Sequence, residues 1–126
     1  MLRKDKVMAF APTTDPARAK KFYRDTLGLR MVKEQMPFAL VFDLAGIMLR
    51  VTVVPKFQPH PFTVLGWQVP NVKTKVRQLA KHGVIFERYP GMQQDEDGIW
   101  HSPDGGRIAW FKDPDGNTLS LAQIDA

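Results

Sequence analysis

The chain has 126 residues, of which 44% are hydrophobic and 25% charged, and it carries a formal net charge of +5 and no cysteine. This length predicts one domain, and the composition is typical of a globular protein. The absence of cysteine excludes disulfides, thiolate catalysis and cysteine-rich zinc sites.

The sequence also argues against membrane and nucleic-acid partners. No apolar run approaches the roughly 20 residues that span a bilayer, and the opening MLRKDKV lacks the apolar core of an export signal. We therefore expect a cytoplasmic protein with no membrane partner. The denser basic stretches, ARAKKFYR and VKTKVR, have the pattern of solvated helix faces, so no nucleic-acid partner is expected.

The first half of the chain predicts a strand, a helix and three further strands. An apolar strand over 7–12 precedes a helix that begins at Pro16, with Asp15 as its N-cap, and ends at Gly28. The apolar side chains of this helix recur at helical spacing: Ala19, Phe22, Tyr23 and Leu27. Strands are expected next over 29–35, 38–44 and 47–54.

The second half repeats this order. A strand over 63–70 leads to a helix that Asn71 caps and Gly83 ends, with an inward face of Val72, Val76, Leu79 and Ala80. Strands are expected after this helix over 84–90, 106–113 and 118–124.

The two halves follow one pattern, which indicates a duplicated module. Asp15 falls on Asn71, and LVFDLAGIMLRV can be laid on AWFKDPDGNTLSL without a gap, which matches Asp43 with Asp113. Both segments predict a hairpin around a glycine. We expect a first module over about 1–56, a proline-rich linker over 55–62 and a second module over about 63–126, all within one domain of 1–126.

Two stretches, DPARAKKFYRDTLGL and WFKDPDGNTLSL, resemble the opening helix and the last hairpin of the vicinal oxygen chelate superfamily. This superfamily includes glyoxalase I, extradiol dioxygenases, fosfomycin-resistance enzymes and bleomycin-resistance proteins. The closing GIWHSPDGGRIAWFKDPDGNTLSLAQ is similar to a subgroup of small bacterial glyoxalase-like proteins of largely unassigned activity. The resemblance covers nearly the whole chain.

The resemblance implies an α+β fold. Two βαβββ modules would pair into a U-shaped, mostly antiparallel curved sheet with the helices outside. It also implies a homodimer. In metal-dependent members, the ligands come from the first and last strands of each module and point into the trough of the U.

Transferred onto this sequence, the four ligand positions carry no suitable side chain. They fall at Met8, Arg50, near Val64 and at Ser120. Zinc, iron, nickel and manganese sites use His, Asp, Glu or Cys, and a guanidinium stays protonated and repels cations. We therefore expect no metal and no other cofactor.

The three histidines offer no replacement site, because no two share the i, i+4 spacing of a helical metal pair. His60 lies in the linker and His82 at the end of the second helix. His101 lies beside the turn HSPDGG. His101 is a candidate for an acid or base at the border of the trough, and a metal-free enzyme would have Ser120 and Arg50 as its further candidates.

Strand alternation predicts which side chains line the trough. The turn DPDGN favours a type I turn with Gly116 in a left-handed bulge position, which places Trp110 opposite Ser120 and puts Phe111 in the core. Leu119 and Leu121 should pack on the helices. Phe38, Leu40 and Phe42 are expected on the Arg50 face. The candidate ligand-binding residues are Met8, Phe10, Phe38, Leu40, Met48, Arg50, Gln68, Trp110 and Ser120.

An apolar, aromatic lining with few polar groups is typical of a small-molecule pocket. Arg50 would hold a carboxylate or phosphate, and Trp110 would stack on a planar group. The main hypothesis is a metal-independent protein that binds an anionic or aromatic small molecule. The alternative is a lyase, isomerase or dioxygenase-type enzyme of the same superfamily, either metal-free or with a non-standard site. A further possibility is an interaction domain whose side chains fill the trough.

Overall fold

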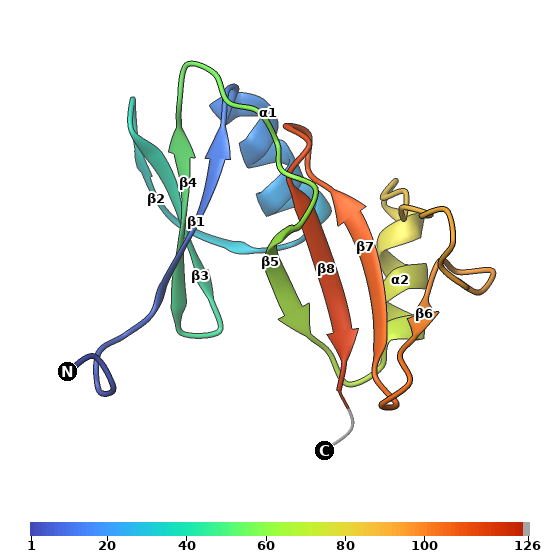
Figure 1. Ribbon diagram of the computed structural model, residues 1–126. Coiled ribbons are helices and arrows are strands. Elements are labelled where there is room, and N and C mark those ends of the chain that lie inside the picture. The colour runs from blue at the N-terminus through green and yellow to red at the C-terminus, as the bar shows by residue number, and fades with distance from the viewer. Residues whose placement is uncertain (125–126) are drawn as a thin grey trace. The chain divides into compact units, whose positions relative to one another are not determined.

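The computed structural model describes residues 1–124. The chain divides into two compact units, Met1–Gln58 and Pro59–Ala126, the second of which ends with two residues outside the described part. Each unit holds a four-stranded sheet and one helical region (Figure 1). The strand orders are β1-β4-β3-β2 and β5-β8-β7-β6, so corresponding strands occupy corresponding places and the predicted duplication is confirmed. No helix within residues 1–124 is long and apolar enough to cross a membrane.

Unit 1 follows its predicted order of elements. The strands are β1 (Met8–Thr13), β2 (Arg30–Gln35), β3 (Ala39–Leu44) and β4 (Ile47–Val53), and the helical region is α1 (Pro16–Lys20) continued by the π-helix η1 (Lys21–Thr26). β1 pairs with β4 in parallel, and the other pairs are antiparallel. As predicted, Asp15 caps the helix by accepting the backbone N–H of Arg18 at 3.1 Å. Gly28 ends it with a φ of 71°.

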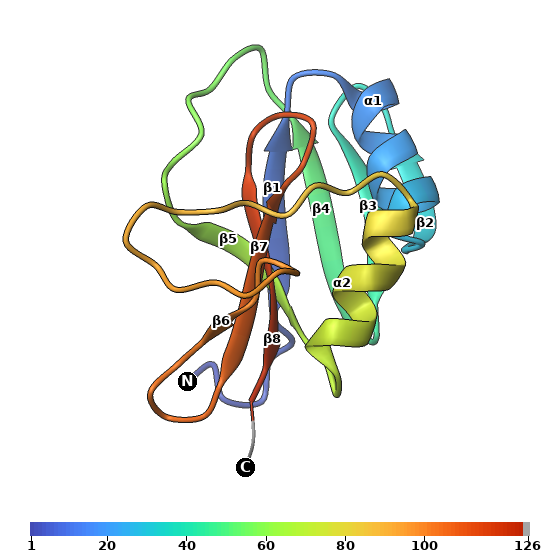
Figure 2. The ribbon, with the colours of Figure 1, turned by 90° about the vertical axis from the view of Figure 1, so that its right-hand side faces the viewer.

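The core of unit 1 lies between its sheet and its helical region, and Figure 2 shows α1 beside β3 and β4. Tyr23, Phe42 and Leu49 are fully buried there, and the rings of Tyr23 and Phe42 lie 6.0 Å apart. Burying one such side chain contributes roughly 1.5–3 kcal/mol. The opposite face of the sheet has no helix of unit 1 on it.

Unit 2 consists of β5 (Thr63–Gln68), α2 (Val72–Lys81), β6 (Trp100–His101), β7 (Arg107–Lys112) and β8 (Thr118–Gln123). Asn71 caps α2 through the backbone N–H of Thr74 at 3.1 Å, and Gly83 follows its end with a φ of 92°. Both were predicted. The core side chains include Val72, Val76, Phe111 and Leu119, each at most 2% exposed.

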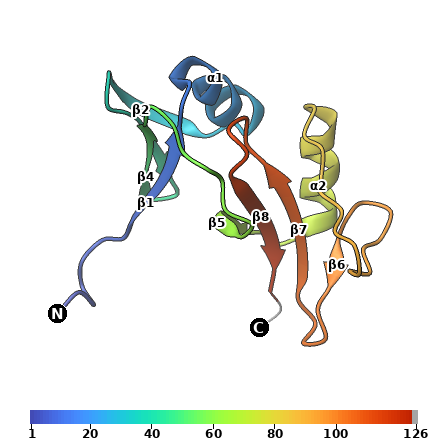
Figure 3. The ribbon, with the colours of Figure 1, turned by 45° about the horizontal axis from the view of Figure 1, so that its top comes forward.

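The strand predicted over 84–90 is wrong. Phe86 makes one isolated bridge to Phe111, and the fourth strand of the sheet is β6 (Figure 3). The Gln94 side chain explains the difference. It accepts the backbone N–H of Tyr89 and donates to the carbonyl oxygen of Glu87, both at 2.8 Å. These bonds satisfy backbone groups that a sheet ladder would otherwise use.

The hairpin between β7 and β8 forms as predicted. The N–H groups of Asp113 and Gly116 donate to the carbonyl oxygens of Asn117 and Asp113, each at 3.0 Å, and Gly116 has a φ of 89°. The buried Asp113 carboxylate also accepts the N–H and the side-chain amide of Asn117, at 2.9 and 2.8 Å. This three-residue loop places Trp110 opposite Ser120.

The hairpin between β3 and β4 has a tighter, two-residue turn. Leu44 pairs with Ile47, and the two turn residues, Ala45 and Gly46, have φ values of 50° and 94°. Both values are positive, as a type I′ turn requires. Because this loop is one residue shorter than that of the other hairpin, Arg50 pairs with Val41 and not with Leu40. The gapless overlay of the two halves therefore predicts the wrong face for each side chain of β3.

One close contact fixes the middle of the unit 2 sheet. Gly66 and Ser120 are paired across β5 and β8, and a Cβ built on Gly66 would lie 2.6 Å from the Ser120 Oγ. Only glycine fits at position 66 while the Ser120 hydroxyl keeps this place.

We expect Ala45→Asn to raise the free energy of unfolding by about 0.5–1 kcal/mol, because Asn adopts the left-handed conformation at lower cost than Ala. Urea denaturation followed by circular dichroism measures the change. Gly46→Ala is the control and should lower the same quantity by about 1 kcal/mol. A neutral or destabilising Ala45→Asn would contradict the strain assigned to this turn.

Gly66→Ala should lower the free energy of unfolding by about 1–3 kcal/mol, because the added methyl group overpacks the Ser120 hydroxyl. The double variant Gly66→Ala, Ser120→Ala removes the hydroxyl and should recover most of that loss. Urea denaturation of both variants and of Ser120→Ala completes the cycle. Strictly additive losses would show that this contact does not limit position 66.

Candidate functional site

The face of the unit 1 sheet opposite α1, called here open face 1, carries four of the predicted ligand-binding residues. Met8 pairs with Met48 and Phe10 pairs with Arg50 across the parallel strands β1 and β4. The side chains of paired residues lie on the same face. Phe10 is 57% exposed, and both methionines are also exposed. The result is a patch of two thioethers, one phenyl ring and one guanidinium.

Arg50 is the charged group of this patch. It is half-buried, and its guanidinium has no ion pair or hydrogen bond with any residue of unit 1, residues 1–58. The neighbouring Phe10 and Val41 are apolar. Since charges taken partly out of water gain from an oppositely charged partner, this guanidinium is well suited to a bound anion.

Three further residues that were predicted on the Arg50 face lie elsewhere. Leu40 was predicted on the Arg50 face, but it pairs with Val51 and is buried on the α1 side. Phe42 has the same orientation. The reason is the two-residue turn, since a shift of one residue moves every side chain to the other face. Phe38 precedes β3 and is 68% exposed.

The face of the unit 2 sheet opposite α2, called here open face 2, carries Trp110 and Ser120 as predicted, with Phe111 buried on the other side. The Trp110 ring packs edge-on against Tyr89 at 5.6 Å and lies 6.2 Å from the ring of Trp100. Gln68 is exposed and pairs with Ala122 at the opposite end of β5 from Thr63.

A hollow of about 470 Å³ lies at one end of open face 2, and we call it the aromatic pocket. Its walls come from the segment before β5, from Tyr89 and from the ends of β5, β7 and β8 next to the hairpin turn. The lining residues are Pro59, His60, Pro61, Phe62, Thr63, Tyr89, Trp110, Lys112, Gly116 and Thr118. Among the residues predicted for ligand binding, only Trp110 lines this pocket.

Sequence reasoning missed most of the pocket. The PHPF stretch was assigned to a linker, yet His60 and Phe62 form one wall and their rings stack 5.1 Å apart. Tyr89 was placed in a strand that does not form. The alternation of β7 already carried one usable signal, because Lys112 lies two residues after Trp110 and therefore on the same face.

His101 does not lie on open face 2. It pairs with Arg107, whereas its neighbour Trp100 pairs with Ile108 on the face that carries Trp110. Successive side chains of a strand point to opposite faces, so His101 points away from Trp110. The prediction that His101 borders a binding face is therefore wrong for unit 2.

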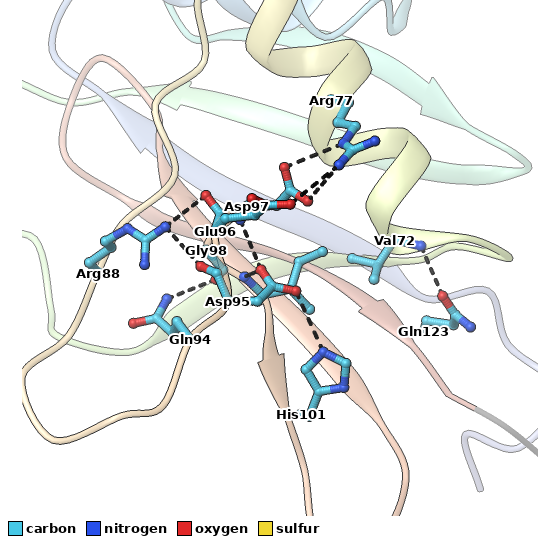
Figure 4. Close-up of polar contacts among 11 residues, drawn as sticks. Val72, Arg77, Arg88, Gln94, Asp95, Glu96, Asp97, Gly98, His101 and Gln123 are labelled. Atoms are coloured by element: carbon cyan, nitrogen blue, oxygen red, sulfur yellow. Dashed lines mark hydrogen bonds and ion pairs between the residues drawn. The ribbon is translucent and has the colours of Figure 1, made fainter.

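The partner of His101 is Asp95, whose carboxylate lies 3.5 Å from Nε2 (Figure 4). Partial burial opposes ionisation of Asp95, but hydrogen bonds from the N–H groups of Ile99 and Asp97 and from His101 outweigh this effect and lower its pKa. Arg88 donates to the carbonyl oxygens of residues 95 and 96, each at 2.8 Å, and Figure 4 shows both bonds. The hydrogen bonds made by Arg88 and by the Asp95 carboxylate thus hold the 94–98 loop in place.

The residues at the transferred metal-ligand positions do not fit a divalent metal. Met8 and Arg50 lie on open face 1, and Ser120 lies against Gly66 on open face 2. A thioether, a guanidinium, the Val64 side chain and a hydroxyl offer no carboxylate or imidazole. Within residues 1–124, no three His, Asp or Glu side chains gather closely enough to hold a metal ion.

Comparison with known proteins places this geometry in a family. No curated protein sequence matches the chain. Among solved structures, TnmS3, an antibiotic binding protein from Streptomyces sp. CB03234, is 25% identical, with a TM-score of 0.74 and coverage of 99% of both chains. A glyoxalase family protein from Enterococcus faecalis is 20% identical, with a TM-score of 0.74 and coverage of 98% of this chain and 100% of that chain.

A lactoylglutathione lyase from Agrobacterium tumefaciens is 18% identical, with a TM-score of 0.69, and the match covers 94% of this chain and 93% of that chain. At this identity the likeness concerns the fold. The sequence model of the Glyoxalase/Bleomycin resistance protein/Dioxygenase superfamily matches residues 6–121. The two repeated units, the matching folds and this long sequence match together show that the chain belongs to the Glyoxalase/Bleomycin resistance protein/Dioxygenase superfamily.

Proposed function

We propose that this protein binds a small anionic or aromatic molecule without a metal ion and does not transform it. The observation that carries the proposal is Arg50, a half-buried guanidinium with no partner in unit 1, set beside Phe10 and the paired methionines on open face 1. Apolar walls with one orienting charge are the usual composition of a ligand site. The aromatic pocket on open face 2 has the same character.

Two further observations support binding over metal-dependent catalysis. The side chains at the transferred ligand positions cannot replace the usual carboxylates and imidazoles. In addition, the 25% identical TnmS3 is an antibiotic binding protein. The two exposed methionines suit a surface that accepts varied ligand shapes, because thioether side chains are flexible and polarisable. We place the protein in the cytoplasm and infer that it is a homodimer.

The alternative function, a metal-free enzyme that uses an acid or a base, is weakened by the position of His101. His101 points away from Trp110 and interacts with Asp95, and Ser120, which pairs with Trp110, packs against Gly66. A serine nucleophile needs a base within hydrogen-bond reach, and no hydrogen bond joins Ser120 to a histidine in the described part of unit 2. Binding without chemistry is therefore the function that we assign.

Thermal-shift screening with carboxylates and aromatic compounds tests the binding function. A ligand present at about 100 times its Kd stabilises the folded state by about 2.7 kcal/mol, so at least one compound should raise the Tm by several degrees. Arg50→Ala should abolish the shift for at least one anionic compound, the ligand of open face 1. Arg3→Ala, at an exposed arginine, is the matched control and should leave the shift unchanged. If no compound stabilises the wild type more than Arg50→Ala, the anchor role is wrong.

Metal content tests the second part of the proposal. After incubation with nickel, zinc, iron or manganese and removal of free ions, mass spectrometry should find far less than one metal ion per chain, because no donor set of the required chemistry is present. Thermal-shift responses should persist in the presence of a chelator. A stoichiometric metal ion that Ser120→Ala or Met8→Ala removes would overturn metal independence.

A further inference from the structure

The aromatic pocket of unit 2 has two walls of paired rings. His60 and Phe62 are stacked nearly parallel, with an interplanar angle of 7°, and they belong to the segment before β5. Tyr89 and Trp110 meet edge-on at 79° and form the wall on the sheet side. The volume of about 470 Å³ lies within the range of small-molecule sites, roughly 300–1,000 Å³. A flat ring system suits these walls.

The charge of the pocket is positive. Lys112 lines it, no carboxylate does, and His60 is the other titratable nitrogen in the lining. The Lys112 ammonium has one acidic neighbour, Glu87, at 3.4 Å, and the two side chains are 50% and 30% exposed. An exposed pair of this kind contributes little to stability. An incoming anion can therefore share or replace Glu87 at little cost.

The remaining polar groups suit the same ligand. Burial and the nearby Glu87 carboxylate raise the pKa of Tyr89, so its hydroxyl stays protonated near neutral pH and can donate a hydrogen bond. Thr63 and Thr118 are the paired first residues of β5 and β8, and they add hydroxyl groups to the lining. These groups orient an acceptor, whereas a cationic ligand would meet Lys112.

The outer wall is held in place by a contact between the segment and the hairpin turn. A Cβ built on Gly116 would lie 3.1 Å from Pro59 Cγ, so the proline packs directly on the glycine. Gly116 also has a φ of 89°, which disfavours any other residue. The same glycine therefore shapes the hairpin and lets the PHPF segment approach the sheet.

We propose that the aromatic pocket binds a flat aromatic ring that bears one anionic group, with the ring between Phe62 and Trp110 and the anion at Lys112. This inference rests on the proposed binding function, but it assigns the ligand chemistry and the contacting residues to unit 2. It makes Lys112, and not Arg50, the residue that distinguishes an aromatic acid from its neutral analogue in this pocket.

Isothermal titration calorimetry of the full chain with 2-naphthoate and 2-naphthamide tests the assignment. The wild type should bind the naphthoate about tenfold more tightly than the naphthamide, because the charged group gains a charge-assisted contact. Lys112→Met keeps the aliphatic stem and should remove this preference by weakening naphthoate alone. Lys81→Met, at the exposed end of α2, is the matched control and should leave both affinities unchanged.

Two more variants separate the parts of the site. Phe62→Ala, at an exposed ring, should weaken both probes by about threefold to tenfold, since it removes a stacking wall and not a charge. Glu87→Gln should leave naphthoate binding unchanged or tighten it, because it removes the competing carboxylate. Unchanged melting temperatures show that each variant is folded.

The outcomes distinguish this inference from the proposed function. If naphthoate binding survives Lys112→Met and Phe62→Ala but is lost in Arg50→Ala, the pocket assignment is wrong and the binding function stands. If the naphthoate preference persists in Lys112→Met with Phe62→Ala still weakening both probes, the anion partner is misassigned. If the wild type binds neither probe, and no compound of the thermal-shift panel, both proposals fall.

Discussion

Every candidate site depends on one constraint, namely which residues of each strand point to which face of its sheet. In a β-sheet a one-residue change in a hairpin loop moves all following side chains to the other face. The loop between β7 and β8 has three residues and presents Trp110 with Ser120, while the turn between β3 and β4 has two residues and presents Val41 with Arg50. Glycine makes both geometries possible, at Gly116 and Gly46. The two repeated units are therefore alike in topology and different in the chemistry of their open faces.

This difference is consistent with the proposal that the family fold carries a binding surface here in place of a metal centre. On open face 1, the position from which a metal ligand would extend is occupied by Arg50, which attracts anions and repels cations. On open face 2, Ser120 packs against Gly66, and the space beside it is taken by Trp110 and its aromatic neighbours. In the proposed binding function, the polar groups that remain would orient a ligand through hydrogen bonds and charge, which requires no coordination chemistry.

The segment over 84–90, where the sixth strand was expected, is likewise shaped by a few specific contacts. Gln94 satisfies the backbone groups of Glu87 and Tyr89, and Arg88 and Asp95 hold the rest of the 94–98 segment. The side chain of Tyr89 is thereby presented to Trp110 at the edge of the sheet. A regular strand over 84–90 would have alternated its side chains strictly, whereas a loop fixed by side-chain hydrogen bonds gives this ring its own orientation. Arg88, Asp95 and His101 thus have a structural role in the described part of unit 2.

The sequence by itself determined the features that depend on local physics. Helix caps at Asp15 and Asn71, left-handed glycines at the helix ends and the DPDGN turn follow from the conformational preferences of a few adjacent residues. The register of Trp110 opposite Ser120 follows from that turn, and the duplicated strand–helix order from periodicity and from the family resemblance. Tertiary structure decided what depends on contacts between distant residues. The face on which Leu40 lies depends on the length of the turn between β3 and β4. The absence of a regular strand over 84–90 depends on the hydrogen bonds of Gln94. The pocket wall formed by His60 and Phe62 depends on the packing of Pro59 on Gly116. None of these contacts leaves a periodic signal in the sequence, because each depends on a single residue: a side chain such as that of Gln94, or a glycine such as Gly116, which has none.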